Sequence, residues 1–236
     1  MTYCAEYCLE VPDDFPVVEL TVFMAEARRV LIPSGNTSTA WQEFGGASNL
    51  IGWRYRASSD AWLEHRRSIE MPGGGPNHED LYLQERSLFL MFSAGVACIE
   101  STTYALAAAA SHPQVCGLTF SPKEQRACSA ARLLTWLTPH AKATELVTTL
   151  QRLLAAPEWT LWVELRNRMT HRSNLPRRHF ASVGGPPPQV RPLNYAPTSS
   201  TPEIDADLAD WDTLRMWLAH ALRDLLVSGT SMLRGA

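Results

Sequence analysis

The sequence predicts an all-α protein: a four- to five-helix up-and-down bundle preceded by a helical N-terminal extension. Apolar residues recur at helical spacing through most of the chain, and no segment shows the alternation of a half-buried strand. Helix-ending signals such as Ser111-His112-Pro113 and Thr138-Pro139 separate the periodic segments. With 236 residues, 45% of them hydrophobic and 19% charged, the chain has the composition of an ordinary soluble globular protein.

The first 75 residues are expected to form the N-terminal extension, to which the sequence assigns no role. The spacing of apolar residues between Asp13 and Ile32 predicts a helix that stops at Pro33. Residues 34–57 show no clean period, and we expect their aromatic side chains to hold a loop or short helix against the bundle. A short helix from Ser59 to Ile69 follows.

Residues 71–76 combine glycine and proline and mark a boundary between the extension, 1–75, and the bundle, 76–236. The first bundle helix is expected over 80–110. An N-cap serine, a first-turn proline and a capping-box glutamate in Ser121-Pro122-Lys123-Glu124 predict a second helix that runs to about Leu137. A third helix is expected over about 141–155.

Pro157 is expected to open a fourth helix, which ends near His171. Residues 173–203 are rich in proline and predict a long surface loop. Acidic residues then suit the positive N-terminal end of the last helix, and Gly229 is expected to cap that helix. The aspartates at this N-terminus are Asp205, Asp207, Asp210 and Asp212.

Charge and cysteine content bound the class of protein. A net charge of -3 argues against a protein that coats nucleic acid through bulk charge. The five cysteines include no Cys-x-x-Cys pair and predict reduced thiols in a cytoplasmic protein. We expect no metal site. A metal site built from Cys4, Cys8 and a histidine is the weaker alternative. The N-terminus lacks a signal-peptide pattern, and the apolar stretch Leu88 to Ala110 is interrupted by polar residues, so we expect a buried helix and no membrane span.

The segment Glu164 to Arg172 carries the strongest chemical signal in the chain. On an ideal helix Asn167 lies about 100° and His171 about 140° round from Arg166, so the amide and the imidazole share a face that the arginine can reach. An imidazole moves protons near pH 7 and a guanidinium holds phosphorane charge. These residue types suit phosphodiester cleavage.

Arg166-Asn167 followed by three residues and His171 resembles the Arg-polar-x3-His signature of the HEPN superfamily of helical bundles. The resemblance covers roughly residues 80–228. It implies a metal-independent endoribonuclease without cofactor, acting as a toxin or antiviral-defence effector, with Arg166, Asn167 and His171 as catalytic residues at a homodimer interface. An antitoxin or regulatory protein is a possible partner.

Several basic residues around the motif are candidates for RNA backbone contacts: Arg168, Arg172, Arg177 and Arg178. A solvated loop, or one paired with the aspartates of the last helix, is the alternative interpretation of these arginines. Arg172 and His179 form a rival pair, which Pro176 makes the weaker one because it breaks the helix. Glu100 on the long helix is a further carboxylate near the site or a structural one.

Two other functions remain open. One is a non-catalytic HEPN module that dimerises or binds a nucleotide, RNA or a protein. The other is a purely structural helical protein in which the motif is accidental, since cationic side chains are common at helix C-termini.

Overall fold

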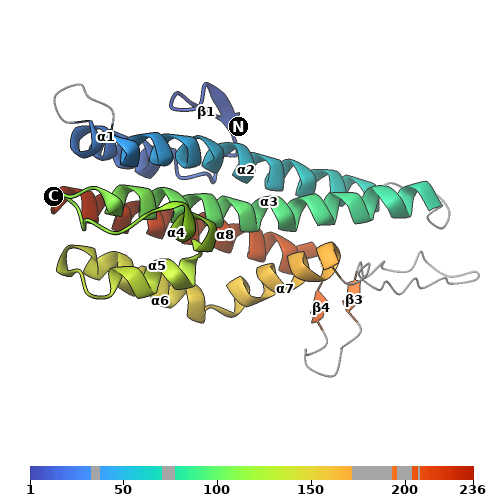
Figure 1. Cartoon of the computed structure of the whole chain (residues 1–236). Helices are drawn as coiled ribbons and strands as arrows, with labels where there is room; N and C mark the ends of the chain where they lie inside the picture. The colour runs from blue at the N-terminus through green and yellow to red at the C-terminus, as the bar shows by residue number, and fades with distance from the viewer. Residues whose placement is uncertain (33–37, 71–77, 172–192, 196–203, 207) are drawn as a thin grey trace, which may run out of the picture.

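The computed structural model describes residues 1–32, 38–70, 78–171, 193–195, 204–206 and 208–236, and it is mostly helical (Figure 1). The all-α prediction is therefore confirmed. Within these residues the only strands are two short antiparallel pairs, β1 (Thr2–Cys4) with β2 (Leu9–Val11), and β3 (Leu193–Tyr195) with β4 (Ile204–Ala206). The sequence did not predict these strands, because three-residue strands are too short to show a period.

Helix α1 (Val17–Leu31) lies where the apolar spacing predicts it. Helix α2 (Thr39–Glu70) corrects the expectation of a loop or short helix over 34–57 followed by a separate helix from Ser59. Gly45, Gly46 and Gly52 lie inside this single helix of 32 residues. Gly52 is needed there because a Cβ on it would meet the ring of Tyr7 at 2.2 Å.

Helix α3 (His78–Ser111) matches the predicted first helix of the bundle. Figure 1 shows α2 and α3 side by side and antiparallel along most of their length. Ser58 donates a hydrogen bond to the carbonyl of Met91, and Arg86 forms an ion pair with Glu64. Among the described residues, one helix, α3, is long and apolar enough to cross a membrane. Most of its apolar stretch is buried inside the bundle, as expected for a core helix.

The second predicted helix is two helices, α4 (Pro122–Ala127) and α5 (Ala130–Leu137). Ser121 caps α4 with the expected capping box, because its side chain accepts from Lys123 N and Glu124 bonds back to Ser121 N. Cys128 then adopts an extended backbone, and Ser129 caps α5 anew. The 3-10 helix η2 (Ala141–Ala143) and α6 (Thr144–Ala155) cover the predicted third helix.

Helix α7 (Pro157–His171) begins and ends as predicted, and helix α8 (Leu208–Arg234) begins among the expected aspartates. Gly229 does not cap α8, which continues to Arg234. A Cβ on Gly229 would lie 2.4 Å from the side chain of Leu106, so this glycine permits close packing of α8 on α3. Apart from β3, the predicted loop at 173–203 lies outside the described residues.

One hydrophobic core unites the helices. Buried residues from α1 and α2, such as Phe23 and Trp62, belong to the same cluster as Leu222 and Leu225 of α8. Helix α8 contacts α1, α3 and α6, and in Figure 1 it runs between α3 and the layer of α5, α6 and α7. Residues before and after position 75 therefore share one core.

Candidate active site on α7

Helix α7 is fixed in the bundle by Trp162, whose side chain is fully buried. Its ring meets that of Phe92 on α3 edge-on, with centroids 5.1 Å apart, and its Nε1 donates to the carbonyl oxygen of Leu214 on α8 at 3.3 Å. Gly95 leaves room for the indole, since a Cβ there would lie 2.4 Å from it. These contacts set the position of the motif that follows one turn later.

Arg166 reaches from α7 to α3. Its Nη2 lies 3.4 Å from Oε1 of Glu100, and the Arg166 and Glu100 side chains are 29% and 50% exposed. The Nε atom of Arg166 is buried without a hydrogen-bond partner among the described residues. The guanidinium is thus paired with a carboxylate, and part of the Arg166 side chain remains accessible to solvent. The sequence left open whether Glu100 lies near the site or is only a structural carboxylate. In the structure Glu100 lies beside the motif, because it pairs with Arg166.

Asn167 is half-buried on α7, and His171 is the last residue of that helix. The backbone therefore places Arg166, Asn167 and His171 on one helix, as predicted. The imidazole of His171 lies outside the described side chains, as do Arg172, Arg177, Arg178 and His179 of the adjoining segment.

Arg168 is buried, with 4% of its side chain exposed, and its Nε lies 3.7 Å from Oε1 of Glu164 one turn earlier. A guanidinium in this position does not present itself to an RNA phosphate, so we leave Arg168 out of the RNA-contacting set and assign it a structural role. The i,i+4 spacing of Glu164 and Arg168 is the sequence signal for this pair.

Tyr104 lies one turn beyond Glu100 on α3 and donates a 2.7 Å hydrogen bond to Oε2 of Glu43 on α2. Burial, followed by the hydrogen bond and the negative charge of Glu43, raises the pKa of Tyr104 well above its ordinary value. The phenol is therefore a neutral donor at physiological pH and unsuited to act as a base.

Arg54 of α2 also contacts α3 near Glu100, and the sequence did not predict this contact. Its Nη1 donates to the carbonyl oxygen of Ala97 at 3.0 Å and to the hydroxyl of Ser101. Residues 34–57 were expected to form a loop or short helix without a clean period, so the sequence did not indicate which side of this segment faces α3.

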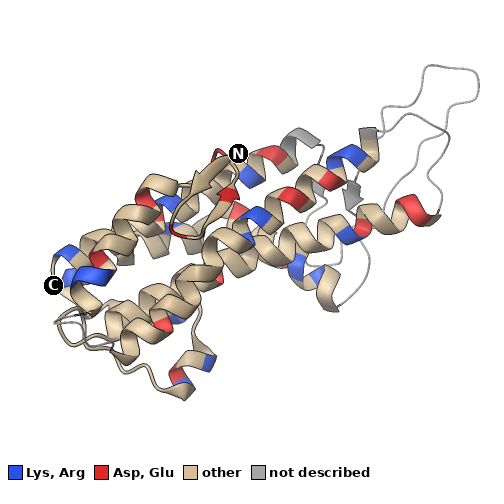
Figure 2. Ribbon diagram, turned by 90° about the horizontal axis from the view of Figure 1, so that it is seen from above, with Lys and Arg blue, Asp and Glu red and all other residues tan. Residues whose placement is uncertain are grey.

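The wider surroundings carry mixed charge. Figure 2 shows Lys and Arg interspersed with Asp and Glu along the helices, with no long face of one sign among the described residues. In the same part of the chain no three His, Cys, Asp or Glu residues lie close enough to hold a metal ion, and the five cysteines are free thiols.

The arrangement thus offers a partly solvent-accessible arginine of α7 paired with Glu100 of α3, a second arginine on α2 that contacts the same turn of α3, and an amide on the motif helix. Comparison with known proteins found no matching family model, no matching curated protein and no matching solved structure.

Proposed function

We propose that this chain is a metal-independent endoribonuclease of the HEPN type, built on a HEPN-like helical bundle. The observation that carries the proposal is the motif Arg166-Asn167-x3-His171 in the last turns of a helix of an all-α protein. The ion pair between Arg166 and Glu100 supports it, because it orients the guanidinium while leaving part of it accessible.

In the proposed reaction the 2′-hydroxyl of RNA is the nucleophile. One His171 imidazole takes the 2′-proton as the 2′-oxygen bonds to phosphorus, and a second protonates the 5′-oxygen as its bond to phosphorus breaks. The products are a 2′,3′-cyclic phosphate and a 5′-hydroxyl. Arg166 stabilises the negative charge on the phosphorane, and Asn167 orients the imidazole or the phosphate.

A single imidazole cannot act as both base and acid in one step, so the proposal requires two protomers. A two-fold symmetric homodimer that brings the C-terminal ends of two α7 helices together supplies both His171 side chains. The enzyme would act in the cytoplasm as a toxin or antiviral-defence effector, and an antitoxin or regulatory protein would restrain it.

The test is cleavage of labelled RNA by purified protein in excess EDTA. We expect 2′,3′-cyclic phosphate ends, with the rate lowered about 10²- to 10⁴-fold by His171→Ala and about 10²- to 10³-fold by Arg166→Ala. Arg152→Ala is the matched control, because Arg152 forms an exposed ion pair with Asp224 at 3.5 Å, away from the motif. Below the dimer dissociation constant, the rate should rise with the square of the protein concentration.

Absence of cleavage by folded wild-type protein, or cleavage that persists in both motif variants, would refute the proposal. In that case a non-catalytic HEPN module is the better reading. It is favoured by exposed apolar side chains toward the N-terminal end of α3, where Tyr82, Phe89 and Leu90 are 57%, 37% and 44% exposed. Such a module would bind RNA or a protein, or dimerise, without cleaving RNA.

A further inference from the structure

Arg54 differs from the other arginines in how its charge is balanced. Most described arginines form an ion pair with a carboxylate, including half-buried ones such as Arg166 and Arg215. Within the described residues no carboxylate lies within 4.0 Å of Arg54, and its guanidinium bonds to two neutral oxygens, those of Ala97 and Ser101. The described arginines that also lack an ion pair, Arg67, Arg126 and Arg132, are exposed.

A half-buried cation without a counter-charge is costly, because water solvates it only in part. The hydrogen bonds to Ala97 and Ser101 offset some of this cost and hold the guanidinium against α3. They do not neutralise its charge. An anionic ligand that approaches Arg54 would gain the Coulombic attraction of a guanidinium that no neighbouring carboxylate neutralises.

The position of Arg54 connects it to the motif. Ala97, Glu100 and Ser101 lie on one turn of α3, so Arg54 from α2 and Arg166 from α7 hold the same turn from two sides. The two arginines and Glu100 together carry one net positive charge. Ser93 and Ala97, one turn apart on α3, are small and half-buried, and Ala97 contacts Arg54.

We propose that Arg54 binds the phosphodiester backbone of single-stranded RNA, next to the phosphate that Arg166 holds for cleavage. This inference rests on the proposed ribonuclease function for the identity of the ligand. Arg54 binds a phosphate flanking the scissile one, and the strand passes across the small side chains of Ser93 and Ala97. Arg54 therefore contributes to substrate affinity and is not a catalytic residue.

The experiment measures binding of the full chain to a labelled 2′-O-methyl RNA of about 12 nucleotides, which has no free 2′-hydroxyl and is not cleaved. Anisotropy gives the dissociation constant between about 50 and 200 mM salt. Arg54→Gln is expected to weaken binding about tenfold and to reduce the slope of log K against log salt by about 0.7, the value for one phosphate contact on a single strand. Arg54→Lys should keep the slope.

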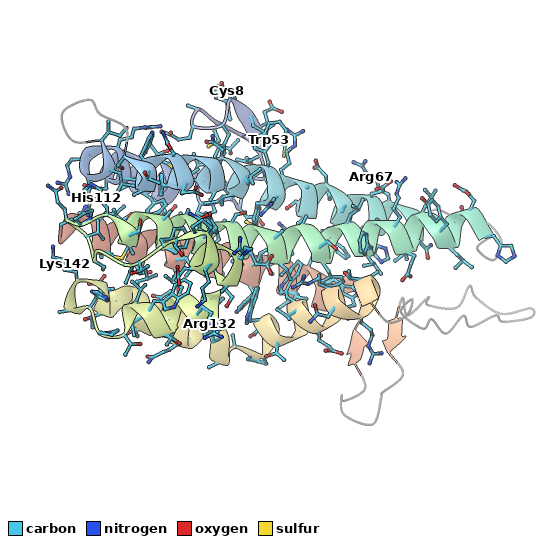
Figure 3. All side chains as sticks on the ribbon, viewed as in Figure 1. Cys8, Trp53, Arg67, His112, Arg132 and Lys142 are labelled. Carbon is cyan, nitrogen blue, oxygen red and sulfur yellow. The ribbon has the colours of Figure 1, made fainter. Side chains whose placement is uncertain are left out.

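Arg67→Gln is the matched control. Arg67 lies on the same helix, is exposed, and points away from the bundle in Figure 3. The substitution Arg67→Gln therefore removes the same charge from another face of the molecule. We expect it to leave both the affinity and the salt slope near their wild-type values. Ala97→Glu is the second test variant: it adds a carboxylate beside Arg54 without removing the arginine, and it should weaken binding as Arg54→Gln does.

The inference fails if Arg54→Gln binds as wild type does, if Arg54→Gln and Arg67→Gln lose affinity equally, or if wild type does not bind the 2′-O-methyl RNA. It also fails if the Arg54 variant loses RNA binding only through a change in oligomeric state, seen by light scattering, because Arg54 then serves an interface between copies. Binding that depends on Arg54 in a wild-type protein that does not cleave unmodified RNA would support the RNA contact and refute the nuclease. Cleavage of unmodified RNA by the wild type, together with unchanged RNA binding in Arg54→Gln, would support the nuclease and refute the RNA contact of Arg54.

Discussion

Gly95 and Gly46 provide a prediction in which one substitution has opposite effects in two helices. In an exposed helix interior, Gly→Ala stabilises by roughly 0.5 to 1 kcal/mol, because alanine loses less backbone entropy on folding. Gly46 is exposed on α2 and a Cβ there meets nothing within 4 Å, so Gly46→Ala should gain this amount. A Cβ on Gly95 instead meets the Trp162 ring at 2.4 and 2.8 Å.

The indole of Trp162 has little freedom to move, since it is buried, packed on Phe92 and hydrogen-bonded to Leu214. Overpacking a rigid core costs about 1 to 3 kcal/mol, and two contacts below 3.0 Å place Gly95→Ala near the upper end. After the propensity gain of up to about 1 kcal/mol, the net loss is about 2 kcal/mol. For a chain of this size that lowers Tm by about 4 to 8 °C, while Gly46→Ala raises it by up to about 4 °C.

Thermal melts followed by far-UV circular dichroism measure both shifts. If Gly95→Ala also raises Tm, the indole has room to move and the close packing of α7 on α3 is not the constraint we describe. Since Trp162 positions the helix that carries Arg166, RNA cleavage by Gly95→Ala below its Tm should also fall, and Gly46→Ala should leave it unchanged.

Two further predictions concern the core. Burial raises the pKa of the Cys98 thiol to about 12, so the unfolded chain ionises this thiol near pH 9 while the folded chain does not. The stability that the raised pKa provides is complete below about pH 8.5 and is lost as pH rises toward 12. Tm should therefore fall less steeply with pH in Cys98→Ala than in the wild type. Equal slopes of Tm against pH in the two proteins would contradict the raised pKa of Cys98. Trp62 donates a 2.7 Å hydrogen bond to Asp212 and joins α2 to α8. Trp62→Phe should cost about 2 to 3 kcal/mol in urea unfolding, and clearly less when Asp212 is already Ala.

The sequence predicted elements whose signals are local. The capping chemistry at Ser121, the proline at 157 and the long apolar run of α3 each specify structure without distant partners. The continuity of α2 was missed although a helical period is present: residues 44, 48, 51, 55, 58, 62 and 65 are all buried. Three of these are polar, Ser48, Ser58 and His65, and their burial depends on contacts with other elements.

In the candidate site, too, some features follow from local sequence signals and others depend on contacts between distant elements. The placement of Arg166, Asn167 and His171 on one helix follows from the spacing of the motif. The ion pair of Arg166 with Glu100 and the contact of Arg54 with Ala97 link positions far apart in sequence, and only the packing of α2 and α7 on α3 brings them together. The burial of Arg168 likewise depends on its surroundings in the fold.

The central place of α8 has a consequence for how the chain is made. This helix follows all the others in the sequence, yet Leu222, Leu225 and Leu226 are fully buried, and Glu19 of α1 forms an ion pair with Arg223 at 3.1 Å. A ribosome adds about 5 to 20 residues per second, so α1 emerges roughly 10 to 40 seconds before its partner helix. During that interval α2 and α3 are able to pair as a hairpin, while the apolar face of α1 that will receive α8 stays uncovered. The nascent chain therefore presents a surface suited to chaperone binding until α8 is synthesised.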